Sequence, residues 1–231
     1  MTWTPPESTL LLTKAGSHAY GTNNINSDED YRGIIYATRD MLLGLSGWDT
    51  QITNDVPDVV LYTLPKFVKL ALNSNPNVIE ILYVAKGDVL KQSAVGRELR
   101  AMRAEFLSQR AMASFTGYAH AQLKRMTAGA GKTGYLHDYD TKNAMHLVRL
   151  YRMGYELLTE GVVNVRRSDA EELINIRNGA WSLNDVINYA NDMDLKCHQV
   201  VSSLPPKPNT EYILEWLMET QLSQLNQGNI R

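Results

Sequence analysis

The amino-acid sequence predicts an α+β protein, with strands in the first part of the chain and helices in the remainder. Runs of apolar, β-branched and aromatic residues that suit short strands occur before about residue 65. From about Ser93 onward, apolar residues instead recur at helical spacing over long segments without strand-like alternation. Strands first and helices afterwards favour either one α+β domain or two subdomains.

Three strands are expected, in order, from local apolar runs and the turn residues that bound them. The first ends at the turn-forming pair Gly16-Ser17, and a Gly/Asn/Ser-rich stretch separates it from the second. Pro57 restricts the start of the third strand to a sheet edge or a first position. The expected ranges are Leu10 to Thr13, Tyr31 to Ala37, and Val56 to Leu64.

The helices are expected from apolar periodicity and from end signals. Gly161 stands where a C-terminal cap is expected, and Ser182 with Asp185 makes a helix start. A flexible loop is expected over Thr127 to Gly134. Asn75-Pro76 is expected to form a turn, and Glu80 is expected to have a structural role. The expected helices are Pro65 to about Asn73, Ala94 to Thr127, Thr141 to Glu160, Ser168 to Asn175, Ser182 to Met193, and Glu211 to Asn226.

Composition excludes several classes of protein. The 231 residues, 44% of them hydrophobic, suffice for one large domain or two small ones. A formal net charge of −2 argues against binding nucleic acid through bulk charge. The single cysteine, Cys197, excludes an intramolecular disulfide and a zinc site built on several thiolates. We find no targeting signal and no membrane span, so a cytoplasmic location is expected.

Two aspartates with one residue between them follow the Gly16-Ser17 turn. Alternate residues of a strand share a face, so Asp28, Asp30 and Arg32 can point the same way. Carboxylates so close repel each other unless a cation lies between them, and Mg²⁺ binds through one or two carboxylates plus substrate phosphates. A third carboxylate is expected from another strand, and Asp58 is the first choice, with Asp55 as its rival. The alternative is an ordinary solvated turn, because Gly, Ser, Asn and Asp are common turn residues.

Basic residues later in the chain offer a second element of a site. Lys142, His146 and Arg149 lie at spacings of four and three, on one side of the expected helix. They could neutralise the β and γ phosphates of a nucleotide across a cleft, or form a solvated face with His146 half-buried. The stretch Gly129 to Thr133 does not make a P-loop, because Met126 stands where that motif needs a glycine.

These motifs together resemble a known family. Gly16-Ser17, ten residues and then Asp28-Glu29-Asp30 match the signature of the DNA polymerase β-like nucleotidyltransferase superfamily. The segments "GSHAYGTNNINSDEDYRG", "PDVVLYTLPKFVKLALNSNPNVIEILY", "KNAMHLVRLYRMGYELLTEG" and "SSLPPKP" are similar to predicted nucleotidyltransferases associated with RNA ligases in bacteria and phages. The resemblance covers most of the chain. It implies a small mixed, polymerase β palm-like sheet in a catalytic domain over residues 1–92, with a helical region over 93–231 packed on it.

The resemblance also implies a reaction. A nucleoside monophosphate passes from a nucleoside triphosphate to a hydroxyl acceptor with release of pyrophosphate, assisted by Mg²⁺ or Mn²⁺ in a two-metal site. Gly16 and Ser17 would hold the triphosphate, while Asp28, Asp30 and Asp58 would bind the metals. The acceptor could be RNA such as tRNA, a protein or a small molecule. The alternatives are a catalytically silent nucleotide- or RNA-binding regulatory protein of the same fold, and a nucleic-acid binding module that uses only the helical region.

Overall fold

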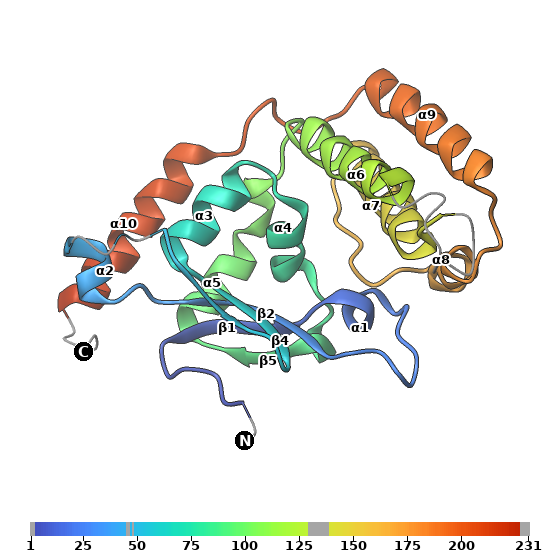
Figure 1. Ribbon diagram of the computed structural model, residues 1–231. Coiled ribbons are helices and arrows are strands. Elements are labelled where there is room, and N and C mark those ends of the chain that lie inside the picture. The colour runs from blue at the N-terminus through green and yellow to red at the C-terminus, as the bar shows by residue number, and fades with distance from the viewer. Residues whose placement is uncertain (1–2, 45–46, 48, 129–138, 227–231) are drawn as a thin grey trace.

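The protein is built on a five-stranded mixed sheet with helices gathered on one side of it (Figure 1). The computed structural model describes residues 3–44, 47, 49–128 and 139–226. In the sheet, the order is β3-β4-β2-β1-β5, and only β2 and β4 run parallel to each other. The strands are β1 (Thr9–Lys14), β2 (Asp30–Ile35), β3 (Gln51–Asn54), β4 (Asp58–Thr63) and β5 (Val89–Gln92). The predicted α+β class with a small mixed sheet is confirmed.

Two of these strands were not predicted from the sequence. The edge strand β3 has a single apolar residue among its four, and its partner β4 lies inside the sheet. The other edge strand, β5, is also only four residues long. Strands this short and polar carry no alternation that can be recognised, because an edge strand buries little side-chain surface. Pro57 immediately precedes β4, as the proline rule requires for an interior strand.

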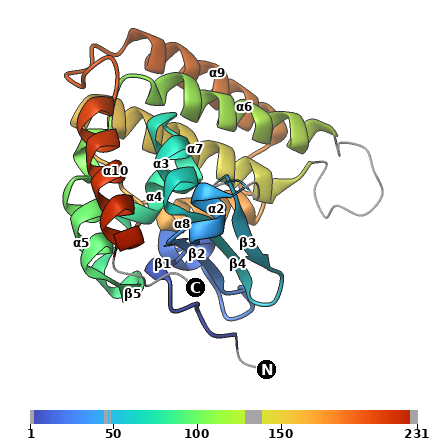
Figure 2. The same ribbon diagram turned by 90° about the vertical axis from the view of Figure 1, so that its left-hand side faces the viewer.

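The helices form two groups (Figures 1 and 2). Helices α3 and α4 cover one face of the sheet, and the chain around Trp3 lies against the other. Helices α6 and α7 run side by side, with α8 and α9 packed on α7. The helices are α1 (Gly16–Tyr20), α2 (Arg39–Leu43), α3 (Leu64–Leu72), α4 (Pro76–Tyr83), α5 (Ala94–Ala101), α6 (Ala111–Ala128), α7 (Thr141–Glu160), α8 (Ala170–Arg177), α9 (Leu183–Gln199) and α10 (Thr210–Asn226), with short 3₁₀ helices over Lys86–Asp88 and Arg103–Phe106.

One predicted helix is wrong. The range Ala94 to Thr127 is not continuous, because α5 ends at Ala101 and α6 starts at Ala111. The intervening 3₁₀ helix and loop turn Phe106 into the core, where its ring packs edge-on against Phe67 at 6.4 Å between centroids. Burial of this aromatic ring outweighs the helical propensity of the segment. Most of the predicted loop over Thr127 to Gly134, including Gly129 to Thr133, lies outside the described residues.

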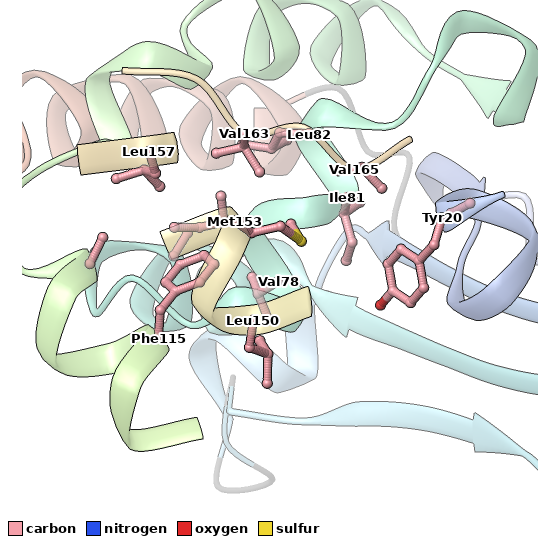
Figure 3. Close-up of a cluster of buried hydrophobic side chains, with 14 of the residues drawn as sticks. Tyr20, Val78, Ile81, Leu82, Phe115, Leu150, Met153, Leu157, Val163 and Val165 are labelled. Atoms are coloured by element: carbon pink, nitrogen blue, oxygen red, sulfur yellow. The ribbon is translucent and has the colours of Figure 1, made fainter. Parts of the chain in front are cut away.

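A single large hydrophobic core joins the sheet to the helical region. Its members come from β1, β2, the helices α1 and α3 to α7, and the chain that follows α7. Figure 3 shows part of it, with side chains from α1, α4, α6 and α7 converging. The helices beyond residue 93 therefore bury apolar surface against the elements that carry the aspartates, which fixes the two relative to each other. Among the described helices, none is both long and apolar enough to cross a membrane.

Candidate functional site

Two aspartates predicted as metal ligands lie side by side where β2 and β4 begin. In this parallel pair, Asp30 is directly opposite Asp58. Burial raises the pKa of Asp30, the positive charge of Arg32 opposes this shift, and the negative charge of Asp58 adds to it. The parallel register thus forces together two carboxylates that would repel each other in the absence of a cation.

The Gly16 turn lies directly against Asp30. The Ala15 backbone N–H donates to the Asp30 carbonyl oxygen at 2.8 Å, which joins the end of β1 to the start of β2. Gly16 has a φ of 56°, in the left-handed region, and a Cβ at this position would overlap the Asp30 carboxylate. Ser17 follows in the first turn of α1. Only glycine allows the backbone to approach the carboxylate this closely.

Gly16→Ala is therefore expected to lower any reaction carried out at the paired aspartates by about 10²-fold, because a displacement of about 1 Å in a reacting group has that effect. The left-handed φ adds a loss in the free energy of unfolding of about 1 to 3 kcal/mol. Steady-state kinetics and urea unfolding measure the two effects. Gly87→Ala is the matched control, because Gly87 has open space at its Cβ position and no positive φ. Equal effects of the two substitutions would contradict the role given to Gly16.

An arginine holds the second carboxylate. Arg32 donates to both oxygens of Asp58, from Nη2 to Oδ2 at 3.0 Å and from Nη1 to Oδ1 at 3.2 Å. Its Nη1 also donates to the Tyr31 carbonyl oxygen at 2.8 Å. This two-pronged pair fixes the orientation of Asp58 and balances its charge. Strand alternation predicts Arg32 on the same face of β2 as Asp30, but it does not predict the pairing of Arg32 with Asp58.

A cavity of about 1180 Å³ opens beside the paired aspartates. Asp28 and Asp55 also line it; Asp28 is exposed just before β2, and Asp55 lies in the turn before β4. Within the described ranges, no group of three or more His, Cys, Asp or Glu side chains is arranged to hold a metal ion. Asp30 and Asp58 nevertheless fit a divalent cation that takes its remaining ligands from substrate phosphates, which is the usual environment of Mg²⁺.

The three basic residues predicted on one side of a helix occur in α7 but differ in environment. Lys142 is exposed, lies close enough to Asp30 to lower its pKa, and lines the aspartate cavity. His146 is partly buried one turn further along α7. Arg149 is buried. A direct contact between Arg149 and a phosphate stays a prediction, and it would require the guanidinium to leave its present partners.

Those partners form a buried network that links α1 to α7. Arg149 Nη1 donates to Glu80 Oε1 at 2.6 Å, and the Tyr20 hydroxyl donates to Glu80 Oε2 at 2.7 Å. The Arg149 guanidinium also lies over the Tyr20 ring, 3.8 Å from its centroid. The sequence analysis treated Glu80 as structural; the signal of its long-range pairing is a lone acidic residue in the apolar helix α4.

The stability of the protein is expected to fall at acidic pH because His146 stays uncharged in the folded state. Burial and the nearby cations Arg149, Lys142 and Arg177 lower the pKa of His146 to about 3, against an ordinary value near 6.5. Below pH 6.5 the unfolded chain therefore binds a proton that the folded protein excludes, so stability falls as the pH falls. Between pH 7 and pH 5, the free energy of unfolding should decrease more in the wild type than in His146→Gln. Parallel pH dependences in urea unfolding would contradict this.

The fold and the site together define a polymerase β-like nucleotidyltransferase, with paired aspartates on neighbouring strands of a mixed sheet and a glycine turn against them. A model of the RNA repair pathway DNA polymerase beta family matches residues 3–200. The chain belongs to this family.

Two individual proteins show more distant similarity. An uncharacterized 38.9 kDa protein in the nrdC-mobD intergenic region of Enterobacteria phage T4 is 28% identical over 142 residues. The aligned part is 56% of this chain and spans 42% of the length of the phage protein. The crystal structure of a nucleotidyltransferase-like protein from Exiguobacterium sibiricum 255-15 matches with a TM-score of 0.31 and 11% identity, over 84% of this chain and 69% of that protein.

Proposed function

We propose that the protein transfers a nucleoside monophosphate from a nucleoside triphosphate to a hydroxyl acceptor. The observation that carries the proposal is the register of β2 and β4, which places Asp30 beside Asp58 and against the Gly16 turn. The acceptor oxygen forms a bond to the α-phosphorus while the bond from that phosphorus to the pyrophosphate oxygen breaks. Pyrophosphate leaves with the electron pair, and the hydroxyl proton passes to Asp58.

Each predicted residue has a place in this reaction. Asp30 and Asp58 would hold Mg²⁺ or Mn²⁺ with Asp28 at the cavity wall, and the register favours Asp58 over Asp55 as the third carboxylate. The bound metal supplies positive charge to the triphosphate and to the attacking oxygen. The backbone N–H groups at Gly16 and Ser17 would bind phosphate oxygens, since the first N–H groups of a helix have no partner within it.

The cationic residues of α7 divide their roles in this proposal. Lys142 contacts the phosphates directly, because it is exposed and faces Asp30. His146 lines the same groove as Gly16 and would form hydrogen bonds to the nucleotide without carrying a charge. Arg149 acts through Tyr20. Its guanidinium lies over the Tyr20 ring, and Glu80 accepts a hydrogen bond from the Tyr20 hydroxyl, so this network fixes α1, the helix that bears Gly16 and Ser17. Arg149 is a positioning residue in this arrangement.

Transfer of label from each α-³²P nucleoside triphosphate tests the proposal. The protein is incubated with Mg²⁺ or Mn²⁺ and, separately, with tRNA, with total RNA or with a protein lysate, and pyrophosphate release is measured in parallel. We expect metal-dependent release of pyrophosphate with label recovered in one acceptor class. The proposal would be overturned if no combination of triphosphate, metal and acceptor class gave release of pyrophosphate.

One observation favours the alternative of a catalytically silent nucleotide-binding regulator. Arg32 already balances the charge of Asp58, which would weaken the affinity of that carboxylate for a metal ion. Such a protein would bind triphosphate with the affinity unchanged by Asp58→Asn, and it would release no pyrophosphate. A loss of metal-dependent binding in Asp58→Asn would instead support the transferase.

A further inference from the structure

A groove of about 960 Å³ runs between α6 and α7 and reaches the turn at Gly16. Gly16 and Tyr20 of α1 and Asn77 of α4 line it, and so do Tyr118 and Arg125 of α6. Lys142 lines this groove and also the cavity of the paired aspartates. A ligand can therefore extend from Asp30 past Lys142 into the space between the two helices.

The α6 wall of the groove includes three small residues. Ala113, Gly117 and Ala121 recur every four residues, which puts them on one side of the helix, and all three line the groove. A Cβ at Gly117 would meet no atom within 4 Å. Small residues on a helix often only allow close packing, but these three line an open groove whose opposite wall carries polar and cationic side chains. The space suits a flat group lying along α6.

The opposite wall, on α7, carries cationic and hydrogen-bonding groups. Lys142 and His146 line it, and Arg149 lies beneath with its Nε buried and without a hydrogen-bond partner. Among the described residues that line the groove, Asp140 is the one carboxylate, and it is already bound as the N-terminal cap of α7 through Asn143 N at 3.0 Å and Asn143 Nδ2 at 2.9 Å. The charges thus favour a ligand with anionic and polar groups.

An aromatic side chain is held rigidly in the groove. The Tyr118 hydroxyl accepts a hydrogen bond from Asn75 Nδ2 at 2.7 Å, which ties α6 to the start of α4. A tyrosine with its hydroxyl anchored presents its ring at low entropic cost, and aromatic rings stack on nucleobases of every kind. Beside it, His146 is uncharged at neutral pH, so it can form hydrogen bonds to a base without repelling the cations next to it.

We propose that the groove between α6 and α7 binds the base and ribose of the donor nucleoside triphosphate, whose phosphates extend to Gly16 and Lys142. This inference rests on the proposed function for the identity of the ligand. Its distinct claim is the position of the nucleoside, which lies in the helical region and not on the sheet. The acceptor then approaches from the aspartate cavity, on the other side of Lys142.

Gly117→Leu tests the position of the nucleoside by filling the groove from α6. The substitution has open space, and it replaces a residue that disfavours helices, so the fold is expected to persist. Calorimetric titration with ATP, GTP, CTP and UTP in Mg²⁺ should show at least about tenfold weaker binding of the preferred triphosphate, in line with the loss of base stacking. Titration with tripolyphosphate, which has no base, should give the same affinity for the variant and the wild type.

Controls separate this inference from the proposed function. Gly87→Leu makes the same replacement at another position with open space and should bind all ligands as the wild type does. Ala121→Leu fills the groove one turn away and should repeat the effect of Gly117→Leu. Because binding is measured apart from turnover, weaker triphosphate binding in the variants supports the groove even where no acceptor is found. Unchanged triphosphate binding in folded Gly117→Leu overturns it, and so does a selective loss of RNA binding, which would assign the groove to the acceptor.

Discussion

Asp30→Asn is expected to lower nucleotidyl transfer by about 10³-fold or more while leaving the protein at least as stable as the wild type. The loss of activity follows from removing a carboxylate whose contribution to metal binding is several kcal/mol, since each 1.36 kcal/mol is tenfold in rate. The gain in stability follows from the raised pKa of Asp30: burial and the nearby Asp58 disfavour its charge in the folded state. Asparagine has the same shape and no charge, so it removes both the cost of burying a charge and the repulsion from Asp58.

Opposite changes in activity and stability distinguish a site residue from a structural one. Pyrophosphate release and urea unfolding at pH 7 are measured on the same preparation. Asp192→Asn removes the same charge from the exposed surface of α9, where Asp192 pairs only with Lys196 one turn away, and should leave transfer unchanged. If Asp30→Asn destabilised the protein and kept its activity, Asp30 would be a structural residue and the proposed site would be wrong.

Much of the candidate site could be predicted because its parts are close in sequence or carry a recognisable spacing. Gly16, Ser17, Asp28 and Asp30 belong to one short stretch, in which strand alternation and turn chemistry act locally. The structure brings Asp30 to Gly16, as the order of strand, turn and strand suggested. The role of each residue stays a proposal, and so does the division of the chain at residue 92.

The remaining parts could not be predicted because they depend on contacts between distant segments. Arg32 and Asp58 meet only because β4 pairs with β2 in one particular register, and the sequence does not state that register. Glu80 and Arg149 are 69 residues apart. From its spacing, Arg149 was expected to share one side of a helix with Lys142 and His146, and that spacing gave no sign of a buried partner. The spacing of charged residues indicates which side of a helix they share, but the neighbouring elements decide whether that side is exposed.

Helix α4 shows a signal that was present in the sequence and was misinterpreted. Asn75-Pro76 was taken as a turn former, yet Asn75 is the N-terminal cap of α4 and accepts from the Asn77 backbone N–H at 3.1 Å. Asparagine followed by proline is a strong start signal for a helix when apolar residues come next. Reading it so would have placed Glu80 inside a mostly apolar helix and raised the question of its partner.

That partner leads to the largest expected effect on stability, which is a loss of about 3 to 5 kcal/mol in Arg149→Met. The side chains of Arg149 and Glu80 are only 4% and 9% exposed. Removing the guanidinium leaves the Glu80 carboxylate buried with the Tyr20 hydroxyl as its remaining partner. Urea unfolding at pH 7 measures the loss.

The double variant Glu80→Gln, Arg149→Met isolates the cause of this loss. Glutamine keeps an oxygen that can accept from the Tyr20 hydroxyl, and methionine fills much of the volume of the arginine stem, so no unpaired charge is left in the core. The double variant should therefore be more stable than Arg149→Met alone, as replacement of buried ion pairs by neutral side chains often shows. Because Tyr20 is the last residue of α1, the single variant should also raise the KM for triphosphate more than it lowers kcat. Equal stability of the single and double variants would mean that lost packing, and not an unpaired charge, destabilises Arg149→Met.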